Sequence, residues 1–143
     1  MNAIIDAVLD YGLADAVAQL HRLGVVALAF FLGGLIGIER ELAERPSGLR
    51  THMLVAGASA LVIQLGDPLL QIFAAEAYRD TLRADTFRLF EAIITGVAFL
   101  GAGTILRRIK EGEVEGLTTA GSILMASTIG ICIGLHQFVL GVG

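Results

Sequence analysis

Long apolar runs separated by short charged segments are the dominant pattern of this chain. The first run, Leu23 to Ile38, carries no charge and ends at Glu39, where the segment ERELAERPSGLRTH places six formal charges before apolar residues resume. A sharp change from hydrocarbon side chains to charges and back is typical of a membrane boundary. The pattern predicts a membrane span at about 23–39 and a second one that begins near Thr51.

The second apolar run is interrupted after Gly66 by the pair Asp67-Pro68. Proline lacks a backbone donor, and the residue before it disfavours the helical conformation. We therefore predict a span over 51–66 followed by a short interfacial helix, with one long kinked helix as the alternative.

Two further spans are predicted from the remaining apolar runs. The third covers about 87–106. The fourth begins at Gly116 and meets no formal charge in the remaining 28 residues, which exceeds the ~20 residues that one span needs. A break at Gly134 to His136 is expected, so the fourth span is 116–134 and residues 137–143 form the possible start of a fifth.

The segment before the first span alternates acidic and apolar residues. Asp6, Asp10 and Asp15 recur at spacings of four and five among aliphatic side chains, which places much of the polar set on one helical face. We predict an amphipathic interfacial segment over 2–20 with a break at Gly12. It does not resemble a secretory signal, because acids stand where a basic region would be.

Composition agrees with a membrane protein. Apolar residues make up 55% of the chain and charged residues 17%, whereas soluble domains average roughly 45–50% apolar and 25% charged residues. The mean hydropathy is +0.77. The predicted fold is an all-α polytopic membrane helix bundle forming one domain, 1–143. The net charge of −4 and the scattered basic residues argue against a nucleic-acid partner. The single cysteine, Cys132, forms neither an internal disulfide nor a cysteine zinc site.

Basic residues in the short loops predict the orientation. The first and third loops lie on one side and hold six Lys and Arg residues, against four on the other side. The positive-inside rule then places these two loops in the cytoplasm and the N-terminus outside. The six are Arg40, Arg45, Arg50, Arg107, Arg108 and Lys110, and the four are Arg22, Arg79, Arg83 and Arg88.

Three motifs carry a family resemblance: ERELAERPSGLRTH, GVAFLGAGTILRR and EGEVEGLTTAGS. In this order and spacing they resemble the N-terminal membrane domain of the MgtC/SapB family, over about Gly33 to Gly134. The resemblance implies a multi-pass, non-enzymatic protein of the bacterial inner membrane with an outward N-terminus. It also implies a role in adaptation to magnesium limitation and in virulence, and regulation of another membrane complex such as the proton-driven ATP synthase.

The chain also departs from that family. Members usually have five spans, and some add a cytoplasmic C-terminal domain, whereas this sequence stops near the start of the fifth span. We expect a truncated piece or a short variant, to which functions of the soluble domain are not carried over. Ser47 stands where the family often has alanine.

Small residues in the spans predict close helix packing. Gly33 and Gly37 form a small-xxx-small pair in the first span, and Gly101 and Gly103 lie in the third. In lipid such positions allow two backbones to approach, within one bundle or between protomers. The third-span glycines lack the spacing and the Lys-Ser/Thr ending of a phosphate loop, so no nucleotide or other cofactor is predicted.

Ionisable residues at span ends are the candidate functional residues, because charges near the membrane tend to have a role. Glu39, Arg50 and His52 are predicted to lie at the cytoplasmic face. They either anchor the helix ends or form a polar cluster that serves as a docking or sensing site. Glu91 lies inside the third span near the opposite face and is predicted not to reach them.

Magnesium would need several hard oxygen ligands. Glu39 with Glu41 or Glu44 supplies two, but the neighbouring arginines oppose a cation, so no metal site is predicted. Two structural roles are also expected. The start of the fourth span is capped, or bonded to a neighbouring helix, by the hydroxyl groups of Thr118, Thr119 and Ser122. His136 is expected to lie at the membrane interface.

Three functions remain open from the sequence. The first is a regulator that packs its small-residue faces against another membrane protein complex. The second is a small-solute or ion carrier that uses Glu91, Asp67 or Gln64 and works as a homo-oligomer. The third, an enzyme, has no support, since the predicted topology gives no serine both a histidine and a carboxylate companion. Membrane lipid is the remaining expected partner.

Overall fold

The computed structural model describes residues 2–73, 86–106, 109–110, 113–114 and 116–142. It contains helices α1 (Asn2–Leu42), α2 (Leu49–Phe73), α3 (Thr86–Leu106), α4 (Leu117–Gly134) and α5 (Phe138–Val142), and a short antiparallel ribbon of β1 (Ile109–Lys110) and β2 (Glu113–Val114). Four of the described helices are long and apolar enough to cross a membrane. The predicted all-α polytopic bundle with four spans is confirmed, apart from the two-residue strands between α3 and α4.

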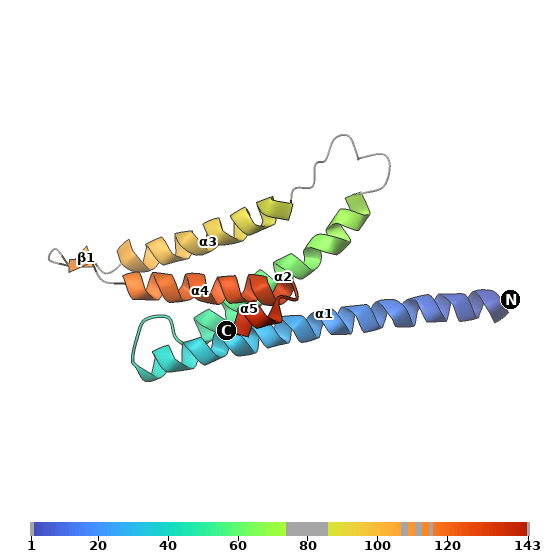
Figure 1. Cartoon of the computed structure of the whole chain (residues 1–143), viewed down its shortest axis with the longest axis horizontal. Helices are drawn as coiled ribbons and strands as arrows, with labels where there is room; N and C mark the ends of the chain where they lie inside the picture. Colours follow the sequence, from blue (N-terminus) through green and yellow to red (C-terminus); the bar gives the residue numbers. More distant parts are fainter. Residues whose placement is uncertain (1, 74–85, 107–108, 111–112, 115, 143) are drawn as a thin grey trace.

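The N-terminal segment and the first span form one uninterrupted helix. α1 runs from Asn2 to Leu42, so the predicted break at Gly12 is wrong. An isolated glycine costs a helix only ~1 kcal/mol relative to alanine, and the good helix formers Leu13 and Ala14 follow Gly12. The N-terminal half of α1 extends past the rest of the molecule in Figure 1.

Pro68 does not end α2. The helix continues from Leu49 through Pro68 to Phe73, so the alternative of one long helix is correct and the separate interfacial helix is wrong. Proline removes one backbone hydrogen bond, and a helix tolerates that loss when the turns on either side are intact. In Figure 1, α2 diverges from α1 toward its C-terminal end.

Helix α4 is the central element of the bundle. It packs against α1, α2, α3 and α5, while α1 and α2 form an antiparallel hairpin and α3 packs mainly on α4 (Figure 1). The core lies where these helices meet and contains Val25, Val26, Ala29, Ala60 and Ile133. α4 buries one side against its neighbours and exposes Leu124 and Met125 on another. Both a buried side and a membrane-facing side disfavour charges, which explains the uncharged sequence of the fourth span.

Glycines allow the three inner helices to approach closely. A Cβ added at Gly33 would lie 2.5 Å from the His52 carbonyl oxygen, and one at Gly37 would lie 2.6 Å from the Leu49 Cα. On α4, a Cβ at Gly130 would collide with the Ala56 carbonyl oxygen of α2. In the α1–α2 and α2–α4 contacts the backbones of the two helices therefore pack directly against each other, as small residues permit in membrane helices.

The chain reverses direction after α4 at the predicted place. The His136 N–H donates to the Ile133 carbonyl and the Gln137 N–H to the Cys132 carbonyl, and His136 has a left-handed φ of 59°. This is the Schellman pattern that ends many helices. It returns α5 onto α4, where Gly141 is buried against Ile133.

Part of the charge count lies outside the described residues. This applies to Arg79 and Arg83 of the second loop and to Arg107 and Arg108 of the third. Asp67 belongs to α2, but its side chain also lies outside the described part of the chain.

Candidate functional site

Arg40 joins three segments at the end of the bundle that carries the α1–α2 loop. Its Nη2 donates to the Thr119 Oγ1 of α4 at 2.7 Å and to the Pro46 carbonyl at 3.2 Å, and its Nε donates to the Ser47 carbonyl at 3.4 Å. The planar guanidinium suits such forked donation. One half-buried cation at the end of α1 thus holds both the loop and the first turn of α4.

Glu41 fixes the start of α2. Its Oε2 accepts from the Leu49 N–H at 2.9 Å, which satisfies one of the backbone donors that a helix start leaves free. A carboxylate at this position is also favoured by the positive end of the helix dipole. Glu44 and Ser47 adopt left-handed φ values of 52° and 60° in the same loop, so the loop has a defined, tight path.

His52 is completely buried between α2 and α4. Its Nδ1 lies 2.9 Å from the Gly48 carbonyl and its Nε2 lies 3.0 Å from the Ser122 Oγ. A carbonyl only accepts, so Nδ1 carries a hydrogen. The Ser122 Oγ–H donates to the Thr119 carbonyl at 2.9 Å, and the same Oγ is the hydrogen-bond partner of Nε2.

We refer to Arg40, His52, Thr119 and Ser122 as the Arg40–His52 cluster. It connects α1, the loop, α2 and α4 through side-chain hydrogen bonds. All buried side-chain polar atoms among the described residues have partners, as a low-dielectric interior requires. The cluster is therefore a satisfied network that fixes the relative positions of three helices.

Two further polar contacts continue along the contact between α2 and α4. Ser59 Oγ donates to the Val55 carbonyl at 2.8 Å and lies 2.9 Å from Ser127 Oγ, so Ser127 is the donor of that pair. At the other end, Gln64 Nε2 lies 2.8 Å from the Gly134 carbonyl and 3.1 Å from His136 Nε2. The His136 ring stacks on His21 of α1, with 5.5 Å between centroids.

Comparison with known proteins assigns the chain to a family. The model of the MgtC family matches residues 26–143. The chain belongs to the MgtC family. This family and the four apolar helices establish a multi-pass membrane protein.

Several curated relatives of the MgtC family are similar to this chain. It is 36% identical over 115 residues to the putative magnesium transporter YhiD of Escherichia coli K12, covering 80% of this chain and 51% of YhiD. It is 36% identical to protein MgtC of Brucella abortus, covering 80% and 42%, and 37% identical to protein SapB of Bacillus subtilis, covering 80% and 47%. The chain spans about half the length of these relatives. No solved structure matches it.

The three motifs of the MgtC resemblance meet in space. ERELAERPSGLRTH supplies Arg40 and His52, and EGEVEGLTTAGS supplies Thr119 and Ser122. GVAFLGAGTILRR brings Gly101 against Ala120, where an added Cβ would lie 3.2 Å from the Ala120 Cβ. Segments far apart in the sequence thus build one end of the molecule.

The structure separates the three residues that the sequence grouped at this end. His52 is buried within the cluster, whereas the side chains of Glu39 and Arg50 are exposed and make no hydrogen bond or ion pair within the described part of the chain. Arg40 occupies the interior position instead. Glu91 is exposed on α3, close to the end of that helix that lies away from the cluster.

The residues at the start of α4 make interhelical bonds. Thr119 bonds to Arg40 and Ser122 to His52, while the N-cap residue is Gly116, without a side-chain cap. Ser122 therefore has a histidine companion that the predicted topology did not provide. The partner of His52 Nδ1 is a carbonyl and not a carboxylate, and the ring has no exposed surface.

Sequence reasoning missed the contacts of Arg40 with Thr119, Ser59 with Ser127, and Gln64 with His136. A usable signal was present, because polar residues inside apolar spans must find partners in a membrane. His52 and Ser59 are seven residues apart, which places both on one face of α2.

Proposed function

We propose that this chain is a non-enzymatic regulator of the bacterial inner membrane that packs against another membrane protein complex. The proposed setting is adaptation to magnesium limitation and virulence, and the proposed complex is the proton-driven ATP synthase. Membership of the MgtC family supports this proposal, as do the names MgtC and putative magnesium transporter of its relatives.

The observation that carries the proposal is the open surface of α3. Only 17% of its apolar span is buried within the fold, against 44% for the spans of α2 and α4. A Cβ added at Gly96 or Gly103 would meet no atom within 4 Å. These two glycines are seven residues apart and share one side of α3, so a partner helix can approach its backbone there.

The glycines of the chain divide into two groups for testing this proposal. Gly33, Gly37 and Gly101 contact other helices of the same chain, so their substitution tests folding. Gly103 is exposed, and its substitution tests a contact with a partner.

The test is crosslinking with mass spectrometry in native membranes, with and without magnesium limitation. Gly103→Leu is expected to reduce the yield of the crosslinked complex, because the larger side chain holds a partner helix away. Gly24→Leu is the matched control, since Gly24 of α1 also has open space around it. Equal yields for Gly103→Leu and the unsubstituted chain would contradict packing through α3. Capture of a complex other than the ATP synthase would remove that partner from the proposal.

A carrier is the second candidate, favoured by the transporter name of one relative. It has less support from the residues that it requires. The Gln64 amide is bonded to the Gly134 carbonyl and His136, and Glu91 is on the exposed side of α3. Magnesium flux into proteoliposomes that is lost on Glu91→Gln would favour the carrier over the regulator.

A further inference from the structure

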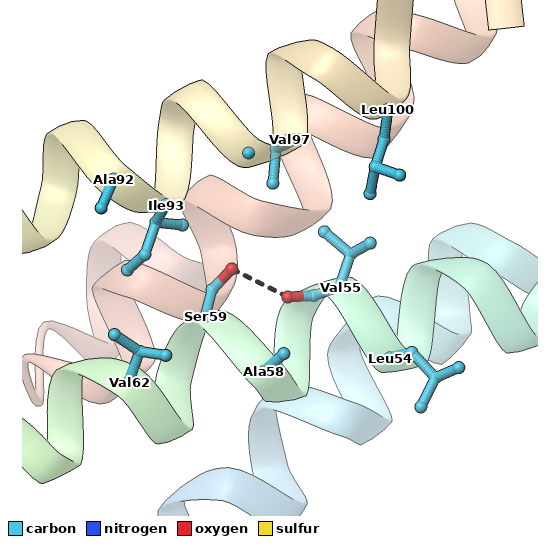
Figure 2. A pocket seen from close by; sticks show the side chains of 10 residues that line it. Leu54, Val55, Ala58, Ser59, Val62, Ala92, Ile93, Val97 and Leu100 are labelled. Carbon is cyan, nitrogen blue, oxygen red and sulfur yellow. Dashed lines mark hydrogen bonds between the residues drawn. The ribbon is translucent and has the colours of Figure 1, made fainter. Parts of the chain in front are cut away.

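An apolar groove lies between α2 and α3, with α4 behind it (Figure 2). Its volume is about 300 Å³, and its walls include Leu54, Ala58 and Val62 of α2 and Ile93, Val97 and Leu100 of α3. One hydroxyl, that of Ser59, reaches the wall, and it already donates to the Val55 carbonyl (Figure 2). Water has almost no polar partner in such a groove, so an apolar occupant is favoured.

The lining of the groove favours a flexible hydrocarbon chain. Such a chain is narrow and adapts its conformation to the apolar side chains of α2 and α3 along the groove.

A positive charge stands near one end of the groove. Arg50 precedes Leu54 by four residues, so both lie on the same face of α2 one turn apart. The Arg50 side chain is exposed and makes no hydrogen bond or ion pair within the described residues. Loop counting predicts the cytoplasmic side for this end, where anionic lipids attract basic residues.

We propose that this groove binds one acyl chain of an anionic phospholipid, whose phosphate pairs with Arg50. The apolar walls then cover the chain along α2 and α3, and the arginine supplies the complementary charge at the headgroup. This lipid site adjoins the proposed regulatory contact, because Gly96 of α3 lines the groove. It requires Arg50 and Ala58, whereas the regulatory contact requires Gly103.

The first test measures lipid preference by native mass spectrometry of the purified chain with phosphatidylglycerol or phosphatidylcholine. Phosphatidylglycerol is expected to be retained better, and Arg50→Gln to lower this preference about fivefold, since one basic residue near an anionic lipid contributes ~1 kcal/mol. Arg45→Gln, which removes an exposed charge from the adjacent loop, should leave it unchanged. Equal retention of both lipids, or equal effects of the two substitutions, would overturn the role of Arg50.

The second test locates the acyl chain with a phosphatidylglycerol that carries a photoreactive group in its tail. Crosslinks are expected on the groove walls and should be lost in Ala58→Phe, which fills the groove. Ala98→Phe is the control, because Ala98 is exposed on α3 and does not line the groove. Crosslinks that persist in Ala58→Phe, or chain-to-chain products from this face, would overturn the site, whereas loss of partner capture by Gly103→Leu would leave it intact.

Discussion

At the scale of single residues, burial of His52 distinguishes it from the other charged and polar residues of its motif. Both ring nitrogens have partners, on α2 and on α4, and the side chain has no exposed surface. The sequence predicted the depth of Glu39, Arg50 and His52 relative to the membrane, because depth follows from the apolar boundary. It did not predict which of them faces inward, since that depends on the neighbouring helix.

His52→Ala is expected to lower the free energy of unfolding by ~2–4 kcal/mol, because it leaves a cavity and removes the hydrogen bonds of the ring to the Gly48 carbonyl and to Ser122. Thermal unfolding of the purified chain in detergent measures this change. Arg50→Ala is the matched control, expected to remain within about 0.5 kcal/mol because its side chain is exposed and unpaired. Equal stability of the two variants would contradict the structural role of His52.

At the scale of helices, the apolar runs predicted the four spans and the reversal after Gly134. The breaks predicted at Gly12 and Pro68 do not occur. The free-energy cost of one glycine or proline in a helix is smaller than the stabilisation from the intact helical turns on both sides. Helix pairing required the structure. Gly37 and Gly103 look alike in sequence, but one faces the Leu49 backbone and the other has open space.

Two glycines of α4 provide a direct comparison between close packing and open space. Gly130→Leu is expected to prevent assembly of α4 with α2, because the side chain would occupy the position of the Ala56 backbone. Gly121→Leu adds the same helix former to the same helix, where an added Cβ meets nothing within 4 Å, and should be tolerated. Size-exclusion profiles and thermal unfolding in detergent compare the two. An undisturbed Gly130→Leu profile would contradict the α2–α4 contact.

At the scale of the whole molecule, α4 contacts every other described helix, whereas the span of α3 is mostly exposed. The sequence predicted a membrane bundle but not this arrangement, because the spans of α3 and α4 are both long and predominantly apolar, and their patterns do not say which helix contacts more neighbours. The structure places the first loop, the end of α3 and the start of α4 at one end of the bundle through the Arg40–His52 cluster and the contact of Gly101 with Ala120. The positive-inside rule predicts that this end faces the cytoplasm.

The central claim is a membrane bundle whose Arg40–His52 end faces the cytoplasm, and cysteine labelling in spheroplasts tests it most directly. In a Cys132→Ser background, single cysteines replace Asp15 of α1 and Arg45 of the first loop, both exposed. With a membrane-impermeant maleimide, we predict that Asp15→Cys reacts in intact spheroplasts and that Arg45→Cys reacts only after permeabilisation. The reverse order, or labelling of both positions in intact spheroplasts, would contradict the account.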